Sequence, residues 1–219
     1  MHEVSHGLID YLDRDGRSRG REWFTSFRDA DGLRTLQVTC VVQTADAGFR
    51  PREAYVRVAK AARHTASGWL CFDGSGVDAF LQNGAARPTA RRLALDAPAL
   101  AFGSHPLIVD GWMAAGFDLR GPRIQPVRRA YVSSYEVDGG GTVDLLPIEF
   151  ALEYLGIGSS EVGAGRFDGN HFRYVLEGSA IEHPPYETWV TTDGEYTLVR
   201  AAMGAPTHYR YDLAHLAPA

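Results

Sequence analysis

Apolar and polar residues alternate along most of this chain, in short runs separated by residues that favour tight turns. A period of two places successive side chains on opposite faces of a β-strand, and turn residues between such runs are typical of antiparallel hairpins. Residues 33–43 and 186–192 are two of these runs. Gly32 and Asp193-Gly194 supply turn chemistry, because glycine adopts positive φ without a steric penalty. The sequence therefore predicts a mainly β protein built as an antiparallel meander.

The alternation breaks in residues 97–118, where alanine, leucine and methionine replace β-branched residues. The spacing of Leu107, Ile108 and Trp112 fits one face of a helix. We expect one or two short helices here, packed in or over the mouth of an open half-barrel or barrel-like sheet. The segment is too short to mark a domain boundary, so residues 1–219 are expected to form a single domain.

Charge and cysteine usage limit the compartments and partners that we expect. The formal net charge is −5, which argues against nucleic acid or an anionic membrane, because both need a basic face. No run approaches the roughly 18 apolar residues of a membrane helix. Residues 1–16 lack the basic start and apolar stretch of a signal peptide. With Cys40 and Cys71 in apolar, strand-like runs, we expect a cytoplasmic protein without membrane insertion.

Sequence signatures of cofactor and metal sites are missing from the chain. There is no P-loop, no G-x-G-x-x-G ahead of a helix, no G-x-S-x-G elbow and no H-E-x-x-H spacing. Neither cysteine has a partner at metal-type spacing. A buried Lys60 would be a candidate Schiff-base amine, but a lysine beside Arg57 and Arg63 is far more often solvated. We therefore expect no cofactor and no bound metal.

Three segments resemble the motifs of an uncharacterised bacterial family. Residues 161–177 resemble its V-x-A-G-x-F-D-x-x-x-F-R strand, and residues 187–200 resemble a hairpin in which a Trp, a Thr, an Asp and an Arg recur. Tyr11, Gly16 and Gly20 are similar to its opening Y-x-x-x-x-G-x-x-x-G. These motifs consist of turns and core aromatics, so they carry information about fold rather than about catalysis.

The family resembles the open half-barrel of the lipoprotein-carrier (LolA-like) proteins. The likeness covers most of the chain loosely and residues 161–213 best. It implies a half-barrel with an apolar cavity. The carriers are periplasmic and have almost wholly apolar pockets, whereas the strands here alternate aromatics with His, Arg, Glu and Tyr. The resemblance therefore implies the fold and a cavity rather than lipoprotein shuttling.

Strand alternation places Phe172 on one face of its strand and His171 and Arg173 on the other. The two polar residues either face solvent or line a cavity, and solvent is the commoner environment for charged groups. His208 alternates with tyrosines in the last predicted strand, residues 207–213. If both strands line one concave surface, His171, Arg173 and His208 form a charged site.

His105 lies where the chain enters the helical insert, shortly before Asp110 and Trp112. An insert that caps an open half-barrel is where a lid would sit, and loops carry function disproportionately. Histidine is the usual acid–base residue near neutral pH. The alternative is a helix-capping loop with a satisfied histidine, and the sequence does not decide between them.

A rigid turn is expected at residues 182–187, EHPPYE, because its two prolines fix the backbone and remove donors. Such a turn can present His183 into the mouth of a cavity, although turning a corner is its commoner role. Trp189 lies two residues beyond Glu187 and should share its side of the strand. There it would form a pocket wall.

The function that these patterns favour is a cofactor-independent lyase or isomerase acting on a small hydrophobic or aromatic molecule in an apolar cavity. Proton transfer, including elimination or retro-aldol chemistry, needs a base, an acid and a group that holds an oxyanion. The candidate catalytic residues are His105 or His171 as base, Tyr154 as acid, with Tyr55 and Tyr186 as alternatives, and Arg173 or Arg57 as anion holder. The candidate substrate-binding residues are Tyr55, Arg57, Trp112, His183, Tyr186, Trp189 and His208.

Two other functions remain open at this point. A non-catalytic binding or carrier protein for a lipid-like or apolar ligand is favoured if the cavity is wholly aliphatic and the polar residues face solvent. A β-sheet interaction module is the third hypothesis, because an open half-barrel leaves edge strands that invite a homodimer. The side chains that line the cavity discriminate between the first two.

Overall fold

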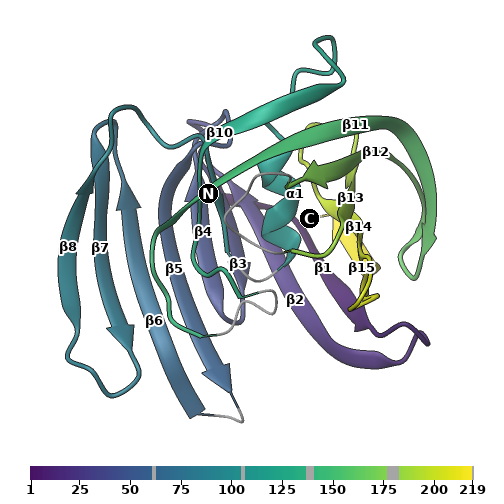
Figure 1. Cartoon of the computed structure of the whole chain (residues 1–219). Helices are drawn as coiled ribbons and strands as arrows, with labels where there is room; N and C mark the ends of the chain where they lie inside the picture. Colours follow the sequence, from purple (N-terminus) through teal and green to yellow (C-terminus); the bar gives the residue numbers. More distant parts are fainter. Residues whose placement is uncertain (61–62, 105–106, 137–140, 177–182, 219) are drawn as a thin grey trace.

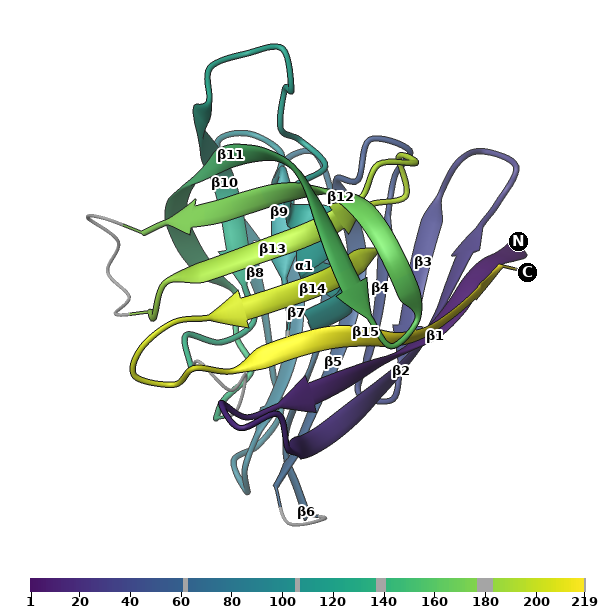
Figure 2. The same ribbon diagram turned by 90° about the vertical axis from the view of Figure 1, so that its right-hand side faces the viewer.

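The computed structural model describes residues 1–60, 63–104, 107–136, 141–176 and 183–218. Within these residues, fifteen strands hydrogen-bond into one open sheet. The order from edge to edge is β8-β7-β6-β5-β4-β3-β2-β1-β15-β14-β13-β12-β11-β10-β9. Figures 1 and 2 show this sheet curling around the short helix α1. The expectation of a mainly β open half-barrel with a short helical insert is confirmed.

The elements follow the chain in two groups. The first group is β1 (His2–Leu12), β2 (Ser18–Arg28), β3 (Arg34–Val38), β4 (Val41–Ala45), β5 (Pro51–Lys60), β6 (Arg63–Phe72), β7 (Gly76–Asn83) and β8 (Thr89–Ala94). The second group is β9 (Ala101–Gly103), the 3₁₀ turn η1 (Leu107–Val109), α1 (Asp110–Met113), β10 (Ile124–Val132), β11 (Leu146–Val162), β12 (Gly165–Val175), β13 (Tyr186–Thr191), β14 (Leu198–Met203) and β15 (Arg210–Pro218).

Strand β1 joins the two groups, because it pairs with β2 on one side and with β15 on the other. Neighbouring strands run antiparallel along the described sheet except for β9 and β10, which are parallel. Parallel neighbours need a crossover connection, and η1 and α1 lie within it. The helical insert therefore belongs to the crossover that starts the second group.

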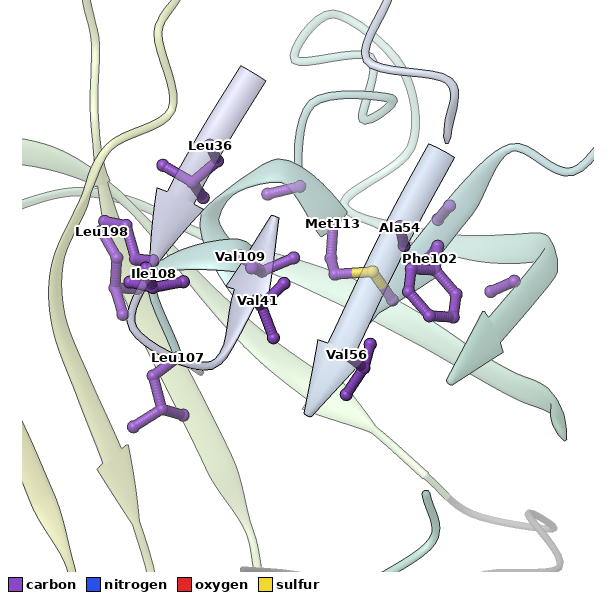
Figure 3. Close-up of a cluster of buried hydrophobic side chains, with 14 of the residues drawn as sticks. Leu36, Val41, Ala54, Val56, Phe102, Leu107, Ile108, Val109, Met113 and Leu198 are labelled. Atoms are coloured by element: carbon purple, nitrogen blue, oxygen red, sulfur yellow. The ribbon is translucent and has the colours of Figure 1, made fainter. Parts of the chain in front are cut away.

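The insert fills the inside of the curl. Leu107, Ile108, Val109 and Met113 are buried, and they pack in one core with side chains from both groups of strands. Figure 3 shows this packing, with Val41 on one side of the insert and Leu198 on the other. Burial of this apolar surface holds the two groups together.

Two polar anchors fix the insert and β9 against distant strands. The Gln43 side-chain Nε2 on β4 donates to the Phe102 backbone carbonyl on β9 at 3.1 Å, and Ser104 Oγ donates to the Gln43 side-chain Oε1 at 3.3 Å. On the other side, a Cβ added at Gly111 would lie 2.1 Å from the Tyr196 carbonyl oxygen. Helix α1 therefore lies directly on the backbone that precedes β14, and only glycine fits there.

Four details differ from the sequence-based expectations, and the first is that strand β9 lies inside the segment 97–118 that is expected to be helical. Residues 33–43 form two strands instead of one, because the chain turns at Thr39-Cys40. His208 has a φ of 50°, so it lies in a turn, and β15 begins at Arg210 instead of residue 207. Residues 2–12, which the alternation does not mark as a strand, form the central strand β1.

Two features of membrane and metal-binding proteins are absent from the described part of the chain. No helix in it is long and apolar enough to cross a membrane. No group of three or more His, Cys, Asp or Glu side chains in the same residues is placed to hold a metal ion.

Candidate functional site

A pocket of about 130 Å³ lies between the insert and strands β10–β14. We call it the Asp110 pocket. Its apolar wall is formed mainly by Leu107, Met113, Val132, Ile148, Phe150 and Met203. Its polar groups include Ser104, Asp110, Ser133, Tyr174, His183 and Tyr186. A mostly apolar concavity with a few converging polar groups is the usual form of a small-molecule site.

Asp110 is the first residue of α1 and places its carboxyl among the apolar side chains of the insert. The Tyr186 hydroxyl on β13 donates to Asp110 Oδ2 at 2.6 Å. Loss of solvent around the carboxylate raises the pKa of Asp110 to about 7, although the Tyr186 hydrogen bond opposes this shift. Near neutral pH this carboxyl therefore exists in both its protonated and its ionised form.

Two tyrosines surround the carboxyl. Tyr186 is buried, and the Tyr174 hydroxyl on β12 donates to the Asp110 backbone carbonyl at 3.4 Å. The two rings pack with their centroids 5.0 Å apart. Burial, followed by the charge of Asp110, raises the pKa of both phenols well above the usual value. Both hydroxyls therefore stay protonated and act as hydrogen-bond donors at neutral pH.

A second carboxyl, that of Glu22 on β2, binds the start of the insert on the side of the first group of strands. It accepts hydrogen bonds from the backbone N–H groups of Leu107 and Ile108, both at 3.1 Å, and from the Tyr11 hydroxyl. Burial, reinforced by the nearby charge of Asp110, raises the pKa of Glu22 to about 7. The insert is thus tied to the first group of strands through Glu22 and to the second through Asp110.

The charges of the pocket select the ligands that it can accept. Asp110 and the exposed Glu136 contribute carboxyl groups to the wall, whereas the described lining residues include no arginine or lysine. His183 lies at the same wall, 5.7 Å from Tyr186 between ring centroids. Among the described lining residues, an anionic head group would meet two carboxyls, with His183 as the one basic side chain. A hydroxyl or amino group would find hydrogen-bond acceptors.

Two of the residues predicted from the sequence, His183 and Tyr186, meet in this pocket. The predicted rigid turn does present His183 to a cavity, with its Nδ1 at 2.7 Å from the Pro184 carbonyl oxygen. Trp112 lies on the far side of α1, where its ring meets Phe49 edge-to-face at 5.7 Å. It lines a different cavity, behind Met113.

His171, Arg173 and Trp189 lie on the outer face of the sheet, away from the Asp110 pocket. The His171 ring stacks on Trp189 at 3.9 Å, and its Nε2 lies 2.9 Å from Glu187 Oε2. Arg173 forms ion pairs with Glu187 at 2.9 Å and with Glu153 at 3.2 Å. These contacts fit the alternative that His171 and Arg173 face solvent. They do not fit the hypothesis that Trp189 forms a wall of the pocket.

The remaining predicted residues are dispersed. The Tyr154 hydroxyl donates to Asn170 Oδ1 at 3.2 Å, outside the Asp110 pocket. Tyr55 and Arg57 are exposed on the outer face of β5, and the exposed His208 lies in the turn before β15. The sequence-based charged site of His171, Arg173 and His208 therefore does not assemble, because His208 is in a turn. His105 lies outside the described residues.

Sequence reasoning missed the two carboxyls that bracket the insert. In the sequence-based interpretation, Asp110 appears only as a neighbour of His105, and no pattern identifies Glu22 as a candidate site residue. One signal was available for Asp110, since it is the single charged residue in the apolar run LIVDGWM. Nothing in the local sequence marks Glu22, because its partners lie 85 and 86 residues away along the chain.

These features define the class of protein: an open antiparallel half-barrel whose helical insert and second group of strands enclose an apolar pocket with an acid in its wall. No protein-family profile and no curated protein matches the sequence. The fold is similar to that of a beta-barrel-like protein of a domain of unknown function, DUF1849, from Brucella abortus. The TM-score is 0.58 at 9% identity, covering 99% of this chain and 98% of that chain. At this identity the likeness shows the fold alone.

Two further crystal structures resemble the chain more weakly. A protein from Bacteroides fragilis described as exported, with a YmcC-like fold, gives a TM-score of 0.40 at 10% identity. A protein from Parabacteroides distasonis described as a lipoprotein gives 0.43 at 11% identity. Each alignment covers 99% of this chain and 96% of the other. Both scores are too low to establish a shared fold.

Proposed function

We propose that this protein binds a small, largely apolar molecule that carries a hydroxyl or amino group, and that the Asp110 pocket is the binding site. The observation that supports this most directly is the Asp110 carboxyl, which lies in an apolar wall with a pKa of about 7. A carboxyl in such surroundings costs stability unless it has partners. Tyr186 supplies one hydrogen bond to it. A donor group on a ligand supplies another.

The orientation of the ligand follows from the same geometry. Its polar group lies at Asp110 and Tyr186, and its apolar body packs against Phe150, Ile148 and Met203. Each methylene that leaves water contributes about 0.8 kcal/mol, so the body supplies most of the affinity. The carboxyl supplies selectivity, because a carboxylate ligand would lie against Asp110 and Glu136.

A displacement assay tests this proposal. The neutral fluorophore N-phenyl-1-naphthylamine is bound to the protein, and primary alcohols, amines and carboxylates of equal chain length compete with it at pH 7.5. We expect alcohols and amines to compete at least about tenfold better than carboxylates, an energy of about 1.4 kcal/mol. Tyr154→Phe, which alters a hydroxyl outside the pocket, should leave the order unchanged. Absence of binding, or a preference for carboxylates, would overturn the proposal.

A second candidate function is cofactor-independent proton transfer in the same pocket, with Asp110 as the acid–base group. A carboxyl that titrates near pH 7 suits both the donation and the acceptance of a proton. Tyr186 donates to this carboxyl at 2.6 Å and would orient it toward a substrate. In the enzymatic step the Asp110 carboxylate removes a proton from a carbon next to a carbonyl and returns it to the same or a neighbouring atom. Removal and return of a proton in this way is isomerase chemistry, whereas a lyase step would also need a leaving group on the neighbouring carbon, expelled with the electron pair of the broken C–H bond.

Hydrogen exchange into a carbonyl compound distinguishes catalysis from binding alone. Acetophenone and phenylacetaldehyde are incubated in D₂O with the wild-type protein or with Asp110→Asn, and deuterium at the α-carbon is measured by NMR. A catalytic Asp110 gives exchange above the buffer rate with the wild type and none with the variant. Equal rates in all samples would reject catalysis on these compounds and leave the binding proposal standing.

A carrier role is the non-catalytic form of the binding proposal, without the enzymatic step. A reducing compartment such as the cytoplasm is supported by the two cysteines, Cys40 and Cys71, which are both free thiols. A homodimer would use the edge of β8, since β9, the other edge of the described sheet, has three residues and all are buried.

A further inference from the structure

A second cavity, of about 90 Å³, lies on the other side of α1 from the Asp110 pocket. We call it the rear cavity. Its apolar wall includes Leu100, Trp112, Met113, Phe117, Val127 and Leu152. Gln125 and the exposed Arg128 lie at its rim, and the Gln125 amide is engaged by the Asp118 and Pro122 carbonyls at 2.7 and 2.8 Å. The rear cavity therefore offers an apolar wall beside a polar side formed by Gln125 and Arg128.

Met113 separates the two cavities. Among the described residues that line them, it is the residue common to both. Its side chain extends from α1 toward Phe102 on β9 (Figure 3), and its sulfur lies 3.6 Å from the position that a Cβ on Gly103 would occupy. The side chain that the two cavities share is therefore a flexible thioether chain that reaches from the helix toward β9.

We propose that Met113 sets the length of the apolar tail that the protein accepts. This inference rests on the proposed binding function, and it narrows the ligand to a single-chain alcohol or amine. The head group lies at Asp110, and the tail runs along the apolar wall until it meets Met113. Chains that end there fit, and longer chains are excluded from the rear cavity by the Met113 side chain.

The residue type suits this task. Methionine is unbranched and fills irregular gaps, so it closes a passage without demanding a fixed shape around it. Met113 is 6% exposed and packs in the core that links both groups of strands. Replacement by alanine removes the three atoms beyond Cβ and joins the two cavities into one elongated site.

A chain-length series tests the proposal. The straight-chain primary alcohols from butanol to dodecanol compete with N-phenyl-1-naphthylamine on the wild type and on Met113→Ala. We expect the affinity of the wild type to rise about fourfold per methylene and then stop rising at a defined length. In Met113→Ala the rise should continue for about three further methylenes or more, because the tail enters the rear cavity.

Matched variants identify the cause of the change. Met113→Leu conserves volume and should keep the wild-type limit. Val127→Phe, added to Met113→Ala, should fill the rear cavity and bring the limit back. If Met113→Ala does not fold, the same series is measured on Met113→Val, which removes less of the side chain and should extend the length limit by less.

The outcomes separate this inference from the function on which it rests. A wild type that binds alcohols with an unchanged length limit in Met113→Ala overturns the role of Met113 and leaves the binding function standing. A wild type that binds no alcohol and no amine overturns both.

Discussion

The carboxyls of Asp110 and Glu22 titrate as neighbours on either side of the insert. Each has its pKa raised to about 7 by burial, and the charge of Asp110 adds to the shift of Glu22. A group whose pKa is higher in the folded state than in the unfolded state binds more protons when folded. It therefore stabilises the fold below the unfolded pKa near 4, and this contribution disappears as the pH rises through 7.

The first prediction concerns Asp110→Asn and the pH dependence of stability. The free energy of unfolding of the wild type should fall between about pH 4 and 7, by at most about 1.4 kcal/mol per pH unit for each titrating carboxyl. Asp110→Asn cannot ionise, so its slope should be shallower. Urea unfolding at a series of pH values measures both slopes. Parallel curves for the two proteins would show that Asp110 does not titrate in this range.

Glu22 gives a second prediction, because its carboxylate is the acceptor for the first backbone N–H groups of the insert. Glu22→Ala leaves the N–H groups of Leu107 and Ile108 without this acceptor, and a buried unsatisfied donor costs about 1–3 kcal/mol. We expect a loss of about 2–5 kcal/mol in the free energy of unfolding. Glu22→Gln should lose less, since its amide oxygen still accepts. Glu149→Ala, at an exposed position, is the control and should change little.

At the level of single residues, the candidate site could be predicted only in part. His183 and Tyr186 were found because a proline-fixed turn beside a strand is visible in the sequence. Glu22 was not, since alternation alone suggests that the adjacent Trp23 is the buried partner. In the structure Trp23 is 59% exposed and Glu22 is 7% exposed. The face of a strand is decided by distant partners, here the backbone of the insert, and these are not encoded locally.

At the level of elements, α1 depends on the absence of a side chain at one position. A Cβ on Gly111 would meet the Tyr196 carbonyl oxygen at 2.1 Å, whereas a Cβ on Gly116 would meet nothing within 4 Å. The two glycines lie in the same segment, and neither has a positive φ. They therefore separate the effect of close packing from the general effect of removing glycine.

The third prediction uses this pair. Gly111→Ala should push α1 away from the strand backbone and destabilise the protein by about 2–4 kcal/mol, as overpacked sites do. It should also weaken probe binding in the Asp110 pocket, because Asp110 moves with the helix. Gly116→Ala should be neutral or stabilising by up to about 1 kcal/mol, since it only restricts the unfolded chain. Equal effects of the two substitutions would contradict the packing argument.

The sequence patterns predicted elements better than their boundaries. The hairpin around Gly32 formed as expected, and that glycine has a φ of 79°. The turn at Cys40 was missed, because no glycine, proline or asparagine marks it. Strand β9 lies inside the segment expected to be helical, since its three buried residues are too few to show a period of two.

At the level of the whole molecule, several sets of contacts join the two groups of strands, including the hydrogen bonds of the Asn83 side chain on β7 with the Val143 backbone at 2.8 and 3.0 Å. Strand β1 bridges them through its pairing with β2 and β15. The insert bridges them through the core, and Arg34 on β3 adds a hydrogen-bonded ion pair with Glu195 at 2.5 Å, ahead of β14. The pairing of β1 with β15 also brings the first and last parts of the chain together (Figure 2). Such long-range pairing favours slow folding.

The fourth prediction is that the two groups of strands unfold together. The chain has four tryptophans, and Trp69 lies on β6 in the first group whereas Trp189 lies on β13 in the second. Two variants that keep only one of these tryptophans, with the other three replaced by phenylalanine, report on each group separately. Because the insert is buried between both groups, we expect the two fluorescence transitions in urea to share one midpoint and one slope.

A substitution in the insert tests whether the insert causes this cooperativity, because the insert packs against both groups of strands. Adding Gly111→Ala to each single-tryptophan protein weakens the contact of α1 with the second group and leaves the pairing of β1 intact. If the insert couples the groups, the Trp189 transition should move to lower urea than the Trp69 transition. If the midpoints already differ in the parent proteins, the two groups are independent folding units and the insert does not couple them. If they stay together in both backgrounds, the contacts that Gly111→Ala leaves in place, among them the pairing of β1 and the Arg34–Glu195 ion pair, are sufficient to join the groups.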